Sequence, residues 1–466
     1  MKRLLGILLS LIFIVSALAS CGKVEEVGDA SGSESYLESD ASGESAKKDG
    51  DNTDNKNNSN NKEENVEEEE DDDGKGNTSQ EKPAFNGKES TSGLKFELNA
   101  DKQSYTLVGK GTCKATDIVI DGHDGLPVTV IGYNAFGDDQ TITSVKIGDY
   151  VEYIEEYAFS MCKKMTSLTL GKRVKFLGDY CFRYCQALTS VEIKENVETI
   201  KYGAFYNCKA LSNIKIPDSV RIIEEYAFDK TAYATDTSKW TNNVLYIGNH
   251  LIQAKTSISG TCKIKDGTKS IAAYAFSGCT SLSGVTIPDS VKAIGAMAFN
   301  KATALNTISI GSGVEYIGEL AFENTKFYNA SGNWKSNVLY IGKYLISAKP
   351  ALSGKCTITD GPLAIAELAF YDCEKLAEVV IPNSVVAIGD YAFLGCKKLE
   401  KVTIGSGVKT IGVYAFKNCS ALKEITMKKT SGWTAGDISI DKTKLASKEE
   451  AVTYLVSTYP DRVWKR

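Results

Sequence analysis

The sequence has few of the residues on which many enzyme mechanisms depend. Its 466 residues include only 2 histidines, His123 and His250. A serine or cysteine nucleophile is activated by a histidine oriented beside it. Both histidines fall in predicted turns or loops, His123 far from the regular cysteine series described below. His250 aligns with Tyr344 of a similar segment, so that position does not require an imidazole. We therefore predict that the chain is not an enzyme.

Motifs for metals, phosphates and nucleic acids are also missing. The 12 cysteines show no Cys-x-x-Cys or zinc-type spacing. Gly109-Lys-Gly111 is too short for a phosphate-binding loop and suits a hairpin turn. The basic residues form no clustered patch, which argues against a nucleic-acid partner. We expect no metal and no cofactor.

The first 21 residues read as a bacterial lipoprotein signal peptide. Lys2 and Arg3 precede an apolar stretch from Leu4 to Ile14, which is too short to span a membrane. The sequence Leu18-Ala-Ser-Cys21 resembles a lipobox, after which cleavage leaves a lipidated cysteine. The alternative is an ordinary cleaved signal with an unrelated cysteine. We expect Cys21 to be lipidated and to anchor the protein in a membrane.

Residues 22–92 have the composition of a disordered spacer. Acidic residues outnumber basic residues by 13 in this stretch, and apolar side chains are few. Such a segment cannot offset the entropy of ordering. We expect it to hold the folded part away from the bilayer. Residues 93–466 carry the remaining charge of +6.

Phenylalanines then recur at a fixed interval of 23 residues, usually after alanine. They form three runs, separated by two gaps of 48 residues. The positions are Phe136, Phe159, Phe182, Phe205 and Phe228, then Phe276, Phe299 and Phe322, then Phe370, Phe393 and Phe416. A fixed period of this length predicts a solenoid, in which each repeat buries its apolar residues against its neighbours.

Alignment on phenylalanine gives the pattern V-x-I-x₃-V-x₂-I-x₃-A-F. One copy runs from Val402 to Phe416. The V-x-I pair places two apolar side chains on one face of a short strand. Each repeat should therefore add one strand to a parallel sheet. Further along, Val408, Ile411 and Ala415 have a spacing that suits a helical turn or irregular coil.

Two motifs within the repeats carry a family resemblance. They are Ile-Pro-x-Ser-Val, as in Ile287–Val291, and Ile-Gly-x-x-Ala-Phe, as in Ile294–Phe299. Through them, residues 94–427 resemble the BspA-like leucine-rich repeat family. The resemblance implies an α/β repeat solenoid with a curved parallel sheet on a bacterial surface, often on a lipoprotein, with binding or adhesion as its role. No asparagine ladder follows the strand here, so ligand contacts of relatives with such a ladder do not transfer.

Two inserts account for the long gaps between phenylalanine runs. Asn243–Ile252 and Asn337–Ile346 alternate apolar residues around Gly248-Asn249 and Gly342-Lys343, as β-hairpins do. Their large rings are of the types favoured at binding hot spots. The alternative is that these rings pack the hairpins onto the solenoid. The candidate binding residues of the hairpins are Trp240, Tyr246, Trp334, Tyr340 and Tyr344.

Both ends of the solenoid should be capped. Phe96–Asn99 and Ser104–Val108 alternate as paired strands before the first repeat. After the last repeat, Ser447-Lys-Glu-Glu450 is a capping box that begins a helix. We assign residues 93–430 to the solenoid with its N-terminal cap and residues 431–466 to a C-terminal cap.

Seven cysteines lie three residues after a repeat phenylalanine. Other repeats have Asp139, Thr231, Ala302 or Thr325 there, which indicates a small and mostly buried packing position. Disulfides between neighbouring repeats are the alternative. The seven are Cys162, Cys185, Cys208, Cys279, Cys373, Cys396 and Cys419.

The residue between the two strand apolars should point outward and form a second candidate binding surface. Apart from Val380 this column is polar, and the alternative is a plain solvated face. Its candidate binding residues are Lys146, Thr169, Glu192, Lys215, Lys263, Thr286, Ser309, Thr357 and Thr403.

The combined features favour a lipid-anchored protein on the extracellular face of a bacterial membrane, preferably on a Gram-positive surface. Its role would be to bind or adhere to an extracellular protein, a glycan or a cell-wall component. A structural protein of the envelope and a non-catalytic scaffold for a separate enzyme remain the alternatives.

Overall fold

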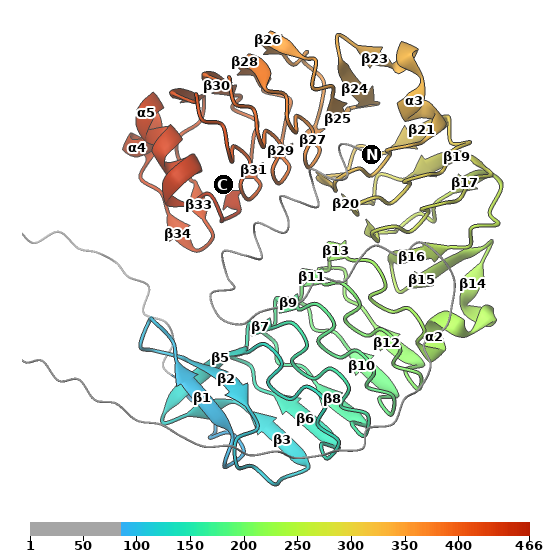
Figure 1. Cartoon of the computed structure of the whole chain (residues 1–466), viewed down its shortest axis with the longest axis vertical. Coiled ribbons are helices and arrows are strands. Elements are labelled where there is room, and N and C mark those ends of the chain that lie inside the picture. The colour runs from blue at the N-terminus through green and yellow to red at the C-terminus, as the bar shows by residue number, and fades with distance from the viewer. Residues whose placement is uncertain (1–84) are drawn as a thin grey trace, which may run out of the picture. The chain divides into compact units, whose positions relative to one another are not determined.

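The computed structural model describes residues 85–466, where each repeat contributes two short strands (Figure 1). Cys21, the predicted signal peptide and most of the predicted spacer lie outside these residues. The described residues fall within one compact unit, Glu81–Arg466. No helix among them is both long and apolar enough to cross a membrane.

The V-x-I pairs form the first strand of each repeat, as predicted. Equivalent residues pair across neighbouring repeats in parallel register, as Val285 does with Ile308 and Val402 with Ile425. These strands are β3 (Asp117–Ile120), β6 (Ser144–Ile147), β8 (Ser167–Thr169), β10 (Ser190–Glu192), β12 (Asn213–Lys215), β17 (Gly260–Lys263), β19 (Leu282–Ile287), β21 (Thr307–Ile310), β26 (Ser353–Thr357), β28 (Lys375–Val380), β30 (Lys401–Ile404) and β32 (Glu424–Met427).

A second series of parallel strands holds the later isoleucine of each repeat. The helical turn or irregular coil expected around Val408–Ala415 was therefore wrong at Ile411. These strands are β5 (Leu126–Ile131), β7 (Tyr153–Ile154), β9 (Phe176–Leu177), β11 (Thr199–Ile200), β13 (Ile222–Ile223), β18 (Ser270–Ile271), β20 (Ala293–Ile294), β22 (Tyr316–Ile317), β27 (Ala364–Ile365), β29 (Ala387–Ile388) and β31 (Thr410–Ile411).

Close contact between repeats favours the second strand over a helical turn. The amide of Gly389 donates to the carbonyl of Ile365 in the preceding repeat at 2.9 Å. A Cβ at Gly389 would lie 2.5 Å from the backbone nitrogen of Glu367. The glycine of the Ile-Gly-x-x-Ala-Phe motif thus lets two backbones approach and hydrogen-bond, where a helical turn would bond within its own repeat.

The repeat phenylalanines are buried and stack along the array. Phe276, Phe299 and Phe322 have no exposed surface. The ring of Phe299 is nearly parallel to those of its neighbours, with centroids 4.9 and 5.2 Å away. Each ring therefore packs on its equivalents in the adjoining repeats, which confirms the solenoid.

The cysteine column is also buried, and the described cysteines are free thiols. The thiol of Cys185 bonds to the carbonyl oxygen of Phe159 at 3.3 Å, and that of Cys208 to the oxygen of Phe182 at 3.1 Å. Burial raises the pKa of Cys162 to about 12. The column thus consists of packing positions with an unreactive thiol.

Both inserts contain the predicted hairpins, each with a third strand. In each insert a short helix and a 3₁₀ turn lead into the tryptophan that begins the first of these strands. The first insert comprises α2 (Ala232–Thr235), η1 (Thr237–Lys239), β14 (Trp240–Thr241), β15 (Val244–Ile247) and β16 (His250–Ala254). The second comprises α3 (Lys326–Asn329), η2 (Ser331–Asn333), β23 (Trp334–Lys335), β24 (Val338–Ile341) and β25 (Tyr344–Ala348).

The N-terminal cap is a pair of antiparallel strands, as predicted. β1 (Lys95–Leu98) pairs with β2 (Tyr105–Gly109), which continues in parallel to β5, and β4 (Gly122–His123) adds to β5. The end of the predicted spacer, residues 85–92, is part of this fold and not spacer. The Lys88 amide donates to Asp121, and Phe85 packs on Tyr150.

The C-terminal cap contains the predicted helix and further elements that the sequence did not predict. Ser447 caps α5 (Lys448–Val452) through a bond from the Glu450 amide, and α5 packs on β32. A π-helical turn, η3 (Thr453–Thr458), and an antiparallel strand, β35 (Trp464–Lys465), follow, and β35 pairs with β31. The other elements are α4 (Lys442–Ala446), β33 (Thr434–Ala435) and β34 (Ile438–Ser439).

Candidate functional site

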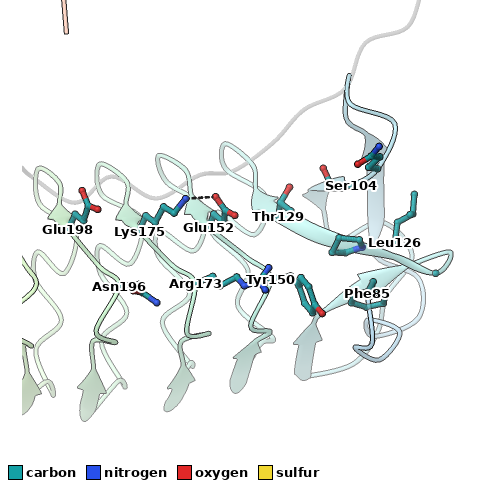
Figure 2. Close-up of a pocket in the computed structure, with 13 residues that line it drawn as sticks. Phe85, Ser104, Leu126, Thr129, Tyr150, Glu152, Arg173, Lys175, Asn196 and Glu198 are labelled. Atoms are coloured by element: carbon teal, nitrogen blue, oxygen red, sulfur yellow. Dashed lines mark hydrogen bonds and ion pairs between the residues drawn. The ribbon is translucent and has the colours of Figure 1, made fainter. Parts of the chain in front are cut away.

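A groove of about 650 Å³ crosses the first repeats at the turn between their two strands. Each turn contains a buried valine, as at Val151, Val174 and Val197. The residues on either side of each valine form the two walls of the groove. Figure 2 shows these walls as two rows of side chains that follow successive repeats.

One wall consists of residues that replace the serine or glycine of other repeats. It is formed by Tyr150, Arg173 and Asn196, each of which directly precedes a turn valine. The first repeat has Pro127 at this position, and the later repeats have serine or glycine, namely Ser219, Gly267, Ser290, Gly313, Gly361, Ser384 and Gly407. The wall therefore exists in the N-terminal repeats and is not a property of the repeat itself.

The opposite wall carries charges of alternating sign. It contains Thr129, Glu152, Lys175 and Glu198. The Lys175 ammonium lies 2.9 Å from the Glu152 carboxylate (Figure 2). Burial disfavours the charged lysine, yet the bond to Glu152 raises the pKa of Lys175 overall.

The Arg173 guanidinium is held over a ring and keeps its donors available. It lies 4.6 Å from the centroid of Tyr150, whose hydroxyl donates to the Asn86 side chain at 3.0 Å. Phe85 packs edge-on against the same tyrosine at 5.1 Å. Within residues 85–466 no hydrogen bond or ion pair occupies the guanidinium of Arg173.

The N-terminal cap lines the groove at one end. Phe85, Leu126 and Pro127 supply apolar surface there, with Gln103 and Ser104 beside them. The groove thus combines apolar rings, a fixed guanidinium with free donors, and hydrogen-bonding groups. Such a set can hold and orient a polar ligand that carries an anionic group.

The predicted tryptophans of the hairpins are half-buried and bonded to their own inserts. The indole N–H of Trp240 donates to the Ala234 carbonyl at 3.0 Å, and that of Trp334 to the Tyr328 carbonyl at 2.8 Å. Lysine ammonium groups lie over both rings, at 5.2 and 4.7 Å. These contacts favour a packing role for the tryptophans.

The predicted tyrosines of the hairpins differ in exposure. Tyr344 is fully buried, and its hydroxyl donates to the Gly311 carbonyl at 2.5 Å, so its place among candidate ligand contacts was wrong. Tyr246 and Tyr340 are half-buried. Tyr340 and Thr357, predicted on different surfaces, line one smaller groove of about 540 Å³.

The strand-face residues occupy equivalent positions on the first strands, which form four separate sheets. Lys146, Thr169 and Thr286 are exposed, and Thr403 at the C-terminal end is half-buried. Of the nine, only Thr357 lines either groove.

His250 is a buried structural residue on a strand and not in a turn or loop. Its Nδ1 lies 2.8 Å from the Ser270 hydroxyl, and its Nε2 lies 3.0 Å from the Pro217 carbonyl. Burial lowers the pKa of His250, which keeps the ring neutral. The neutral ring donates from Nε2 and accepts from Ser270, tying the first hairpin to the preceding repeat. His123 also lies on a strand, β4, stacked on Phe96 with centroids 4.3 Å apart.

A family model for the BspA type leucine rich repeat region matches residues 111–235, 232–353 and 351–447. The chain belongs to this family. Proteins with these repeats are generally bacterial cell-surface proteins that act as binding scaffolds, and no enzyme family is indicated. Within the described residues, no group of His, Cys, Asp and Glu side chains is placed to hold a metal ion.

Several solved structures are similar to this chain of BspA-type repeats. A leucine rich cell surface protein from Faecalibacterium prausnitzii is 26% identical, with 73% of this chain and 94% of that chain covered and a TM-score of 0.27. A leucine-rich repeat protein from Bacteroides ovatus is 21% identical, with 71% and 92% covered and a TM-score of 0.23. The pneumococcal vaccine antigen PcpA is 17% identical, with 79% and 96% covered and a TM-score of 0.27. Comparison with curated proteins gives no match.

Sequence reasoning missed the wall residues of the groove, although a signal for them was present. Tyr150, Arg173 and Asn196 break a column of serine and glycine. When the side chain at one repeat position changes from small to large over three consecutive repeats, the change indicates a local function such as ligand binding. Phe85 was missed because the acidic composition around it placed it in the spacer.

Proposed function

We propose that this protein is a lipid-anchored bacterial surface protein that binds an extracellular protein, glycan or cell-wall component through the N-terminal groove. The observation that carries the proposal is the wall of Tyr150, Arg173 and Asn196 where other repeats have serine or glycine. Other repeats of the solenoid fold with a small residue at this position. The large side chains are therefore not required for the repeat to fold, and we assign them to ligand binding.

The available donors of Arg173 support a binding role. A planar guanidinium forms two parallel hydrogen bonds with a carboxylate or phosphate group. The ring of Tyr150 and its neighbour Phe85 hold this group in place before a ligand arrives, which reduces the entropy lost on binding. A groove prepared in this way suits recognition without a chemical step.

The proposed site is tested by replacing Arg173 with the serine that other repeats carry there. The full-length chain would be screened against immobilised extracellular matrix proteins, glycans and cell-wall fragments. For the ligand that is retained, we expect Arg173→Ser to weaken binding about 10-fold or more, as loss of a charge-assisted hydrogen bond would. Melting temperature would be measured in parallel and should not fall.

Lys172→Ser is the matched control, since it removes one positive charge next to the groove wall. Lys172 is exposed and pairs with Asp149 at 3.2 Å, outside the groove lining. The affinity of the Lys172→Ser variant for the ligand should stay within about twofold of the wild type, because loss of an exposed ion pair has a small effect. Equal losses in the two variants, or no retained ligand, would show that the groove is not the binding site. Retention on wall fragments alone would favour the structural envelope protein over an adhesin.

Membrane anchoring is tested separately at the lipobox. Cys21→Ala should leave the protein as an unprocessed precursor or release it into the medium, because no acyl chains can then be attached. Cell fractionation and the apparent mass of the product distinguish these outcomes. A variant that stays on the membrane at the normal processed size would contradict the lipobox. The long acidic spacer supports a Gram-positive surface, where the folded part would have to pass a thick wall.

A further inference from the structure

A row of tyrosines runs along five consecutive repeats, just after the second strand of each. We call Tyr133, Tyr157, Tyr180, Tyr202 and Tyr226 the tyrosine row. Successive ring centroids are 5.9, 5.3, 5.1 and 5.5 Å apart. The two end rings are 63% and 45% exposed, and the three between them are half-buried. The row is therefore a continuous aromatic surface that a ligand can reach.

The row follows two adjacent positions of the repeat. Tyr157, Tyr180 and Tyr226 lie two residues before the repeat phenylalanine and have φ values of 57°, 53° and 57°. In the repeats of Tyr133 and Tyr202 that position is Asn134 or Gly203, and the tyrosine comes one residue earlier. The left-handed conformation belongs to the repeat, because it recurs at Tyr274, Met297, Leu320, Leu368, Tyr391 and Tyr414. The unbroken run of ring contacts, and not the backbone, sets these five repeats apart.

An arginine without a counter-ion lies among these rings. The guanidinium of Arg183 is 5.4, 4.9 and 5.2 Å from the ring centroids of Tyr157, Tyr180 and Tyr184. Its Nε is buried and has no hydrogen-bond partner within residues 85–466. No ion pair forms with Arg183 in the same part of the chain. A half-buried charge without a carboxylate is costly unless a ligand supplies the anion.

The geometry favours a repeating ligand over a peptide. Peptides commonly add to a free strand edge or place a helix in an apolar groove. The tyrosine row lies in the turns that follow β5 to β13, whose strands are paired with those of adjoining repeats. Neighbouring rings meet edge to face, except Tyr157 and Tyr180, which stack on each other. One ring per repeat at an even spacing instead suits a chain of sugar rings that follows the repeats, with its C–H groups against the exposed parts of the rings.

We propose that the tyrosine row and Arg183 bind an acidic polysaccharide, with a sugar carboxylate on the guanidinium and neighbouring sugars along the rings. The inference rests on the binding role proposed above but uses a different surface. Arg183 follows the repeat phenylalanine Phe182, whereas the groove lies before the second strand. Arginine suits this role because its planar fork matches a carboxylate while its face remains on the rings.

The test uses the full-length chain with polygalacturonate, its methyl ester and poly-L-glutamate as probes. We expect binding to polygalacturonate only, because the methyl ester lacks the charge and the polypeptide lacks the sugar faces. Arg183→Gln should weaken this binding about 10-fold or more, as a lost charge-assisted bond does. Tyr226→Asn should weaken it as well, and asparagine keeps the backbone conformation that the position requires.

Matched controls come from the other end of the array. Lys417 follows Phe416 as Arg183 follows Phe182, and its ammonium lies 4.4 Å from the centroid of Tyr414. Lys417→Gln and Tyr414→Asn should leave binding unchanged. The proposal is overturned if polygalacturonate does not bind, if its methyl ester binds as well, or if the controls lose as much affinity. Equal binding of poly-L-glutamate would assign the site to a peptide. Loss in Arg173→Ser but not in Arg183→Gln would place this ligand in the groove and leave the proposed function standing.

Discussion

Replacement of Phe299 by alanine is expected to lower the free energy of unfolding by about 3–5 kcal/mol, as loss of a buried phenylalanine does. The side chain is fully buried and stacks on Phe276 and Phe322. The substitution leaves a cavity between two rings that cannot close, because hydrogen-bonded strands fix the separation of the repeats. Chemical denaturation monitored by circular dichroism measures the change.

The damage should also extend beyond the altered repeat. In a solenoid each repeat is stabilised by its neighbours, so loss of one interface weakens those beside it. Hydrogen exchange should accelerate in the repeats that contain Phe276 and Phe322 as well. Tyr133→Ala, at a ring that is 63% exposed, is the control and should cost far less. A cost below about 1 kcal/mol for Phe299→Ala would contradict this account of the core.

The second large effect is expected for replacement of Glu367, which should change the stability of the protein in a pH-dependent way. The Tyr316 hydroxyl donates to Glu367 Oε2 at 2.6 Å, and the Glu319 amide donates to the same oxygen at 3.1 Å. Burial, followed by the nearby carboxylates of Asp390 and Glu319, raises the pKa of Glu367 from 4.5 to about 8. Burial also raises the pKa values of Asp390 and Glu319. The folded protein therefore keeps Glu367 protonated where the unfolded chain does not.

The sign of the effect follows from proton binding. Between pH 4.5 and about 8 the folded state holds more protons at Glu367 than the unfolded state. The contribution of this carboxyl to stability is fully present below pH 4.5 and is lost as the pH rises towards 8. Glu367→Gln keeps the shape and the acceptor oxygen but cannot ionise. We expect this variant to be more stable than the wild type at pH 9 by a few kcal/mol, about 1.4 for each pKa unit that is realised.

Stability measured from pH 4 to pH 9 checks this expectation, with both proteins nearly equal at pH 4. Glu374→Gln is the control, because Glu374 is exposed and the Lys397 ammonium lowers its pKa. The Glu374→Gln substitution should not increase the stability of the protein at high pH. Parallel stability curves for Glu367→Gln and the wild type would show that Glu367 is ionised in the folded protein.

The repeat pattern in the sequence was sufficient to predict the buried core but not the surface of the solenoid. Val-x-Ile and Ala-Phe predicted the first strands and the phenylalanine stack, because their apolar residues recur at one position in every repeat. The two-residue second strands, such as β31, were missed because two residues show no alternation. Their pairing depends on how closely the repeats stack, which glycines such as Gly389 permit.

Candidate binding residues were harder to predict than the core. A tyrosine in a hairpin can face the core or the solvent, and only the position of the hairpin against Gly311 shows that Tyr344 is buried. The strand column predicted as a binding surface holds no aromatic residue. The tyrosine row lies after the second strand, at two adjacent positions of the repeat. The walls of the groove likewise required knowledge of which side chains converge on either side of Val174.

The inserts have a consequence for how such proteins can change in length. Each of the three long sheets begins with antiparallel strands that lead into parallel ones: β1 and β2 before β5, β14 to β16 before β18, and β23 to β25 before β27. We call an insert together with the repeats that follow it a block. The antiparallel strands of an insert begin a block in the same way as the N-terminal cap begins the solenoid. Trp240 and Trp334 mark equivalent points 94 residues apart. Recombination between these points would add or delete a whole block with its own starting strands, so evolution could extend or shorten the protein without creating an unpaired edge.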